Sequence, residues 1–380
     1  MTESNPATSQ GRLLDTQDEE DPYHAPIPRP TQEDHLPMAF RPIYHFDAHK
    51  QSWIMQMPTT LPSDASRLTQ FKLITWNIDF MQSYGEERYI AALNFLERFL
   101  TQDESPGSTR LVSSTVILLQ EIDQRLLEYI TGHPFVRESY LTTDISGNTW
   151  LNDDNVYGVV TLIPKTYSGN VASVFRTNFP GSRMGREALY VDLVLPNPEE
   201  LIPSTEGDTV AFDHEREGES QQLRYLRIAN VHLESLRGRS DAERLEQLSS
   251  TVPFLTAPGV HVGVVAGDMN PIGPEDAGLP LKLGLIDAWI AYTRRKRERE
   301  GCTISDEEID DDPLGYTWGY QPPTTFSPRR MDKVLMCGNV DVVDIERIAD
   351  GLEVQVVDET EMQVLWVTDH CGLFASLVVE

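Results

Sequence analysis

The apolar run from Val262 to Ala266 stops abruptly at Gly267, and Asp268 and Asn270 follow at once. A short run of this kind, rich in β-branched residues and ended by a glycine, is typical of a buried strand that ends at the edge of a sheet. At a spacing of two in an extended segment, the carboxylate of Asp268 and the carboxamide of Asn270 point the same way. Such a pair could activate water and hold an oxyanion, although Gly-Asp-x-Asn is more often a plain turn.

Four other apolar runs end in the same way, and this repetition is what constrains the fold. The polar residues are Asn77 and Asp79 after residues 71–76, Glu121 after 114–119, His232 and Glu234 at the end of 225–232, and Asp369 and His370 after 364–367. Taken singly, His232 also fits a core histidine and Glu121 a helix N-terminal acid. We expect the five strand ends to converge on one rim, because only then do their side chains serve one site.

Apolar residues at helical spacing separate these strands, as in Glu86 to Leu100 and Arg239 to Ser250. Closely spaced strands with interspersed helices predict an α/β protein, a four-layer sandwich of two packed mixed β-sheets flanked by helices. We expect one domain over residues 71–380. Residues 1–43 are poor in apolar residues and are predicted to be a disordered tail, and residues 44–70 an arm or linker.

The chain is strongly acidic, with 60 acidic against 31 basic residues and a net charge of −29. Two stretches, residues 199–219 and 298–312, each contain eight acids and one base, and both are predicted to be solvated insertions. This charge argues against nucleic acid as a general partner. A bound polyanion would need a local group of arginines and a divalent cation.

Other sequence features concern the compartment. The scattered Cys302, Cys337 and Cys371 lack ligand spacing and predict reduced thiols in an intracellular protein. We expect a monomer in the nucleus or the cytoplasm. No apolar run reaches the length of about 18 residues that a membrane span needs, so we expect no membrane partner. The basic tetrad at residues 294–297 fits a solvated helix face better than a nuclear localisation signal.

If the strand ends meet, several carboxylates and two imidazoles share one site. Carboxylates held close together repel one another unless a cation lies among them, and oxygen ligands favour Mg²⁺, or Mn²⁺, over zinc. Such a cation polarises a phosphoryl oxygen and neutralises the charge that develops on it. The residues therefore predict a metal-dependent phosphodiesterase or phosphatase.

Five stretches resemble, in chain order, the motifs of the endonuclease/exonuclease/phosphatase superfamily. They are Thr75-Trp76-Asn77-Ile78-Asp79, Leu119-Gln120-Glu121, His232-Leu233-Glu234-Ser235, Gly267-Asp268-Met269-Asn270 and Thr368-Asp369-His370. The resemblance covers residues 71–380. Within the superfamily, residues 75–79, residues 232–248, and Tyr316-Thr317-Trp318 followed by Arg330-Met331-Asp332-Lys333 look like the 5′-tyrosyl-DNA phosphodiesterases. These nucleases act in DNA repair and release a tyrosine left on a DNA 5′ end.

The resemblance implies which residues hold the metal and the substrate. Glu121 would bind Mg²⁺ with the support of Asp79, and Asp369 would hold metal-bound water and the neighbouring histidine. Arg237 would contact the DNA end that carries the tyrosyl adduct. Glu234 would also lie at the substrate.

The resemblance implies the catalytic residues as well. Asp268 would be the general base that aligns the attacking water. Asn77 and Asn270 would orient phosphate oxygens, and His370 and His232 would stabilise the pentacovalent phosphate. A phenolate is a good leaving group, with a pKa of about 10, so the reaction needs little acid assistance.

The chain departs from the family pattern at a few positions. Met269, Pro271 and Ile272 occupy places where more polar residues are expected, and Cys371 stands where the family often has Trp. Two alternatives to the DNA substrate therefore stay open. One is a phosphatase or nuclease that acts on an inositol phosphate, a nucleotide or RNA, and the other is a non-catalytic interaction protein.

Overall fold

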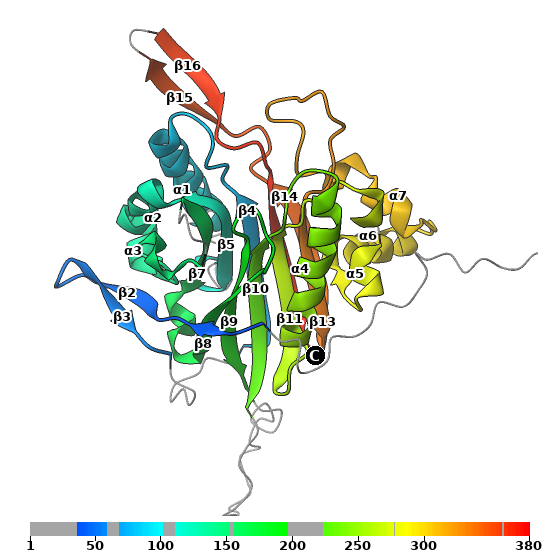
Figure 1. Ribbon diagram of the computed structural model, residues 1–380, viewed down its shortest axis with the longest axis horizontal. Helices are drawn as coiled ribbons and strands as arrows, with labels where there is room; N and C mark the ends of the chain where they lie inside the picture. Colours follow the sequence, from blue (N-terminus) through cyan, green and yellow to red (C-terminus); the bar gives the residue numbers. More distant parts are fainter. Residues whose placement is uncertain are drawn as a thin grey trace, which may run out of the picture.

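A computed structural model describes residues 36–58, 68–101, 111–151, 156–196, 223–276, 278–358 and 361–380. Two β-sheets pack face to face, and helices cover their outer faces (Figure 1). The predicted four-layer α/β sandwich is confirmed.

One sheet has seven strands in the order β1-β8-β9-β10-β11-β13-β12. These strands are β1 (Ala39–Phe40), β8 (Val171–Asn178), β9 (Glu187–Leu195), β10 (Arg224–His232), β11 (Val260–Asp268), β13 (Asp332–Gly338) and β12 (Ile286–Asp287). Only β10 and β11 are parallel neighbours, and their register sets His232 beside Asp268.

The other sheet has eight strands in the order β14-β17-β4-β5-β7-β6-β2-β3. These strands are β14 (Val340–Ile348), β17 (Gly372–Val379), β4 (Gln70–Asn77), β5 (Thr115–Asp123), β7 (Tyr157–Pro164), β6 (Tyr140–Thr142), β2 (Ile43–Asp47) and β3 (Ser52–Gln56). Here β4 and β5 are the parallel pair, so the polar residues that end them lie at the same edge.

Helices cover both outer faces. Next to the eight-stranded sheet lie α1 (Gly85–Thr101), α2 (Leu127–Gly132) and α3 (Pro134–Ser139), and next to the seven-stranded sheet lie α4 (Arg239–Leu255) and α5 (Leu279–Lys282). The helices α6 (Ala288–Arg299) and α7 (Asp306–Asp310) lie at one edge of the sandwich, where α6 contacts β13 and β14 of the two sheets. Short 3-10 helices span Leu111–Ser113, Gln124–Leu126, Gly147–Thr149, Lys165–Asn170, Pro274–Asp276 and Pro313–Gly315. Among the described helices, none has the length and apolar character that a membrane span requires.

The strands show why the apolar runs of the sequence are continuous. Both faces of a central strand are covered, so β11 is apolar on the side that meets the other sheet and on the side that meets α4. Val264 belongs to the core between the sheets, whereas Val265 packs in the outer core. Trp76 is fully buried in the corresponding outer core under α1.

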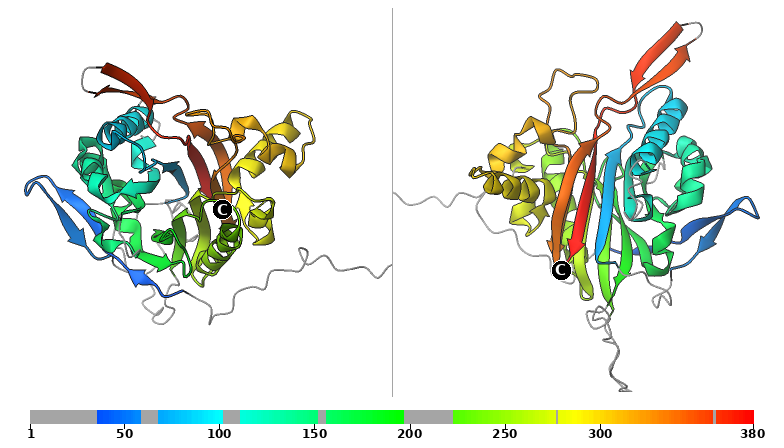
Figure 2. Two further views of the ribbon diagram at one scale, coloured as in Figure 1. Left: turned by 45° about the horizontal axis from the view of Figure 1, so that its top comes forward. Right: turned by 180° about the vertical axis from the view of Figure 1, so that it is seen from behind.

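A hairpin of β15 (Glu353–Asp358) and β16 (Glu361–Trp366) forms a separate two-stranded sheet. It projects from the body of the protein next to α1 (Figure 2). The chain passes from β16 directly into Thr368, Asp369 and His370.

Parts of the predicted tail and arm belong to the sheets. The predicted tail extends to residue 43, but β1 pairs with β8, and the hairpin of β2 and β3 continues the eight-stranded sheet beyond β6. The remaining tail (residues 1–35), part of the arm (59–67) and the predicted insertion at 199–219 lie outside the described residues. The predicted insertion at 298–312 contains the end of α6 and the whole of α7.

Gly267 allows the two parallel strands β10 and β11 to approach closely. Its φ is +149°, and a Cβ atom at this position would lie 1.7 Å from the carbonyl oxygen of Val231. We expect Gly267→Ala to lower the free energy of unfolding by about 3 kcal/mol, because the strands must separate or the backbone must strain. Urea denaturation measures the change.

Gly132→Ala is the matched control. The nearest group to its Cβ position is the Arg137 guanidinium at 3.9 Å, which is an ordinary contact. Its unfolding midpoint should stay at the wild-type value. Equal stability of both variants would contradict this account of Gly267.

Candidate active site

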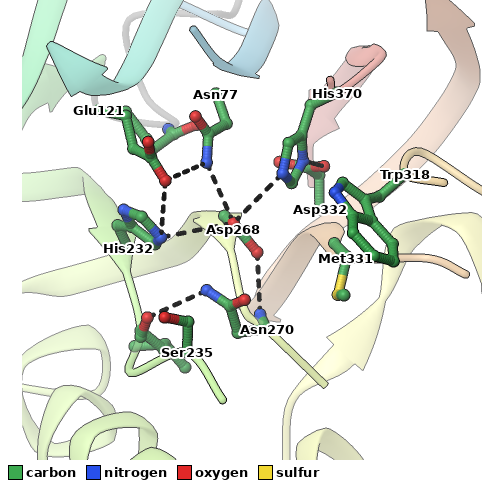
Figure 3. Close-up of polar contacts among 12 residues, drawn as sticks. Asn77, Glu121, His232, Ser235, Asp268, Asn270, Trp318, Met331, Asp332 and His370 are labelled. Carbon is green, nitrogen blue, oxygen red and sulfur yellow. Dashed lines mark hydrogen bonds and ion pairs between the residues drawn. The ribbon is translucent and has the colours of Figure 1, made fainter. Parts of the chain in front are cut away.

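The strand ends bring five of the predicted site residues together. Asn77 ends β4, Glu121 lies in β5, His232 ends β10, Asp268 ends β11, and His370 lies just before β17 (Figure 3). The Asn77 amide nitrogen donates to Glu121 Oε1 and to Asp268 Oδ2, both at 3.1 Å. The convergence expected from the sequence is thus present for these five side chains.

A local irregularity in β5 turns Glu121 toward the site. The register between β5 and β7 shifts between Leu119 and Ile122, and Glu121 has a φ of +56°. Such a bulge re-aims a side chain at the end of a strand. The Phe80 amide also donates to Glu121 Oε2 at 3.3 Å, which fixes the carboxylate.

Asp268 lies at the centre of the cluster. Its Oδ1 accepts from the backbone N–H of Asn270 at 2.9 Å, and its Oδ2 lies 3.4 Å from His232 Nε2 and 3.7 Å from His370 Nε2. Burial raises the pKa of Asp268 to about 6, although the nearby His370 acts in the opposite direction. A carboxylate with a pKa close to neutral is suited to take a proton from water.

Arg186 fixes the protonation state of His232. One nitrogen of its buried guanidinium points at His232 Nδ1. A guanidinium can only donate, so Nδ1 is the acceptor and the ring proton lies on Nε2, which faces Glu121 and Asp268. Burial and the Arg186 charge also lower the pKa of His232 well below its ordinary value. His232 is therefore a neutral hydrogen-bond donor.

Asp332 holds the other histidine. Its Oδ2 lies 2.7 Å from His370 Nδ1, and the carboxylate is fully buried. Burial alone would lower the pKa of His370, but the carboxylates of Asp332, Asp369 and Asp268 outweigh it and raise that pKa well above its ordinary value. His370 is therefore a cationic donor.

Arg186 and Asp332 were not among the predicted site residues. Asp332 could have been found, because the motif Arg330-Met331-Asp332-Lys333 was already part of the family resemblance. Arg186 had no such signal, because it precedes β9 and does not follow an apolar run.

Asp79 and Asp369 lie at the outer side of the cluster. Asp79 accepts from the Met81 amide at 3.2 Å and from Gln82 Nε2 at 2.6 Å, and Asp369 accepts from Trp318 Nε1 at 2.8 Å. Burial raises the pKa of Asp79, and the charge of Asp369 raises it further. The two carboxylates therefore act on each other.

The remaining predicted residues lie around the cluster. Asn270 donates from its side chain to the Leu233 carbonyl at 3.1 Å, next to Asp268. Arg237 is exposed on the rim and donates to the Ile272 carbonyl at 2.8 Å.

Glu234 lies outside the cluster. It is fully buried, and its carboxylate accepts from Ser182 at 2.7 Å and from Gln247 at 3.0 Å. Its role at the substrate stays a prediction.

The donor atoms of this site fit a divalent cation. One ligand atom each from Glu121, His232 and Asp268 lies within 4.8 Å of the others. His232 carries its proton on the nitrogen that faces the site and so offers no lone pair there, which leaves the carboxylates of Glu121 and Asp268. Burial raises the pKa of Glu121 to about 7. Glu121 would therefore gain most from a hard cation such as Mg²⁺, which prefers oxygen ligands, and Asp268 lies beside it.

Comparison with known proteins gives a family and a fold. The Endonuclease/Exonuclease/phosphatase family matches residues 74–370 of this sequence. No curated protein matches it.

Three solved structures resemble this one. D. rerio TDP2 complexed with single strand DNA product is 19% identical, with a TM-score of 0.51 over 81% of this chain and 99% of that chain. A truncated Caenorhabditis elegans TDP2 is 16% identical, with a TM-score of 0.53 over 82% of this chain and 99% of that chain. A mannosyl-6-phosphatase of Bacteroides thetaiotaomicron is 11% identical, with a TM-score of 0.51 over 81% of this chain and 99% of that chain. At these identities the likeness is one of fold.

The raised pKa of Glu121 gives a testable pH dependence. The folded protein holds a proton on this group up to about pH 7, whereas the ordinary pKa is 4.5, so the folded state binds more protons in between. In metal-free protein this group therefore lowers the free energy of unfolding as the pH rises through that window. Glu121→Gln lacks this titrating group, so its free energy of unfolding should fall by about 2 kcal/mol less than that of the wild type over the same pH window. Urea denaturation in EDTA at several pH values measures the difference.

Mg²⁺ provides the internal check for this prediction. It should stabilise the wild type more at about pH 8 than at about pH 5, because proton and metal compete for Glu121. It should stabilise Glu121→Gln much less at either pH. Equal Mg²⁺ stabilisation of both proteins would rule out Glu121 as a ligand.

The interaction of Asp332 with His370 can be tested by titration. Asp332→Asn removes the strongest attraction for the proton of His370, so the pKa of His370 should fall. NMR titration of the imidazole measures this pKa, and the signal is assigned by its loss in His370→Gln. Any hydrolytic activity should fall by about tenfold or more above neutral pH, because the cationic donor is lost. An unchanged pKa of His370 would contradict the assigned interaction of Asp332 with His370.

Proposed function

The chain belongs to the Endonuclease/Exonuclease/phosphatase family, and we propose that it is a Mg²⁺-dependent phosphodiesterase that hydrolyses 5′-phosphotyrosyl DNA adducts. Membership of this family makes it a hydrolase of phosphoester bonds. The observation that carries the catalytic proposal is the buried Asp268, held by Asn77 between a neutral and a cationic histidine.

Each residue has a definite task in this reaction. Asp268 takes the proton of the attacking water, and the Asn77 amide keeps its carboxylate in place. His232 and His370 donate to the phosphate oxygens as negative charge develops in the transition state. Asp332 keeps His370 protonated and oriented.

The metal supplies what these residues lack. Mg²⁺ bound by Glu121, with support from Asp79, would polarise a phosphate oxygen and screen the carboxylates from the anionic substrate. The leaving tyrosine departs as a phenolate with a pKa of about 10, so it requires no dedicated acid.

The substrate is inferred from the sequence motifs and from a local group of arginines. Arg183, Arg237 and Arg239 are each at least half exposed around the start of α4. Arg183 and Arg239 both pair with Glu243, at 3.4 and 2.8 Å, and Arg237 lies 3.8 Å from Asp241, so these three arginines share two acids. The excess of one positive charge is what a DNA end would meet on an otherwise acidic protein. The activity would belong to DNA repair, in the nucleus or the cytoplasm.

A second candidate is a phosphatase that acts on another phosphoester. The fold likeness to the bacterial mannosyl-6-phosphatase, with a TM-score of 0.51, is similar to the likeness to TDP2. The same base, donors and metal would serve a phosphomonoester, and only the contacts beyond the phosphate would differ.

A substrate panel distinguishes the two candidates. With Mg²⁺, the wild type should release tyrosine from a 5′-phosphotyrosyl oligonucleotide and leave a 5′ phosphate. It should be slower on sugar phosphates, inositol phosphates, nucleotides and RNA. Asp268→Asn should reduce the rate by about a thousandfold, because the general base is lost while the fold is kept.

The control variant is Asp311→Asn, whose exposed side chain forms no ion pair among the described residues and lies outside the catalytic cluster. It should keep most of the activity. Hydrolysis of another phosphoester without tyrosine release would replace the proposed substrate and keep the chemistry. No Mg²⁺-dependent hydrolysis of any substrate in the panel would favour the non-catalytic interpretation.

A further inference from the structure

A cavity of about 640 Å³ lies outside the active site, at the edge of the seven-stranded sheet. It is lined by α5, β12, α6 and α7 and by residues of β13 and β14, and we call it the edge groove. The helices α5, α6 and α7 lie together on one flank of the protein (Figures 1 and 2). None of the catalytic residues lines it. Its volume is in the range of about 300–1,000 Å³ that is typical of ligand sites.

The edge groove has an apolar floor and an apolar lip. Leu285 and Met336 are buried at its base, whereas Leu281 and Ile286 are 71% and 48% exposed. Large apolar side chains that remain exposed beside a cavity indicate a contact surface.

One wall of the edge groove is an open strand edge. β12 is the last strand of its sheet, and Ile286 pairs with Met336 of β13 on one side only. Within the described residues, no strand pairs with the other side of β12. An extended polypeptide could therefore add its backbone there.

The charge that is left uncompensated in the groove is negative. Six acidic and three basic side chains line it. The three bases all have partners, because Arg294 pairs with Asp306, Arg295 pairs with Asp341, and Lys333 pairs with Asp310 at 2.9 Å and Asp287 at 3.5 Å. Glu298 and Glu307, both exposed, form no ion pair among the residues that the structure describes.

This charge excludes several occupants. A nucleic acid would be repelled, and so would a second copy of a chain with a net charge of −29. The segments of this chain outside the described residues are acidic as well, with eight acids and two bases in residues 1–35 and eight acids and one base in residues 199–219. A basic partner is complementary to the groove.

We propose that the edge groove binds an extended segment of a partner protein in which apolar residues alternate with lysine or arginine. The apolar side chains would contact Leu281, Ile286 and the floor, and the basic side chains would meet Glu298 and Glu307. This site is independent of the proposed catalytic activity. It gives a role to the acidic stretch at residues 298–312, which forms one wall of the groove through α7.

The test uses a fluorescein-labelled peptide of alternating leucine and lysine and a leucine-glutamate peptide of equal length. Fluorescence anisotropy at physiological salt should show binding of the basic peptide alone. The triple variant Leu281→Ser, Glu298→Gln, Glu307→Gln should bind it about tenfold more weakly, which corresponds to about 1.4 kcal/mol. Hydrogen exchange should show protection by the basic peptide in α5, β12 and α6.

A matched variant separates groove binding from general attraction to an acidic protein. Leu245→Ser, Glu246→Gln, Glu87→Gln removes one exposed leucine and two exposed acids on α4 and α1, and its affinity should equal that of the wild type. Equal weakening of both triple variants would overturn the proposal. Equal binding of the acidic peptide, or protection outside the groove, would overturn it too.

Discussion

Buried amides that join the two sheets are the interactions on which the active site depends. Asn77, in the eight-stranded sheet, donates to Asp268 in the seven-stranded sheet at 3.1 Å. Deeper in the core, Gln120 donates to Asn230 across the same interface at 2.8 Å, and Asn230 in turn donates to the Leu119 and Val160 carbonyls. A buried amide that loses its hydrogen-bond partner costs free energy, so these bonds favour one position of the two sheets. Apolar contacts alone would let one sheet shift relative to the other. These amides therefore fix the relative position of the two sheets, and with it the distances between Asp268 and the other side chains of the candidate site.

The sequence predicted which strands end at the site, but it could not show what sets their chemistry. The runs that end at Asn77, Glu121, His232 and Asp268 were recognisable because both faces of central strands are covered. The proton on His232 Nε2, in contrast, depends on Arg186, which reaches the histidine from the segment just before β9. The tautomer of His232 is set by a residue that only packing brings next to it. Arg186 belongs to no periodic pattern, so the sequence around it gives no sign of this contact.

The elements at the borders of the domain were also hard to predict, for a different reason. Residues 298–312 have the composition of a solvated loop, yet α7 forms there because Ser305 caps it and Ile309 is fully buried. Two isoleucines, Ile304 and Ile309, are too few in an acidic stretch for periodicity to detect. Similarly, β1 has only two residues, and its strand conformation follows from pairing with β8 and not from its own sequence.

The distribution of charge bears on how an acidic protein can act on a phosphoester. Five carboxylates surround the site, those of Asp79, Glu121, Asp268, Asp332 and Asp369, and the cations that act on them include His370, Arg186 and Arg88. Five negative and three positive charges would repel an anionic substrate, and the raised pKa values of Glu121 and Asp268 lower this charge in part. In the proposed mechanism, Glu121 would exchange its proton for a divalent cation, and the added positive charge would favour the ionised form of Asp268. Metal binding and the readiness of Asp268 to accept a proton would then be two consequences of one electrostatic balance.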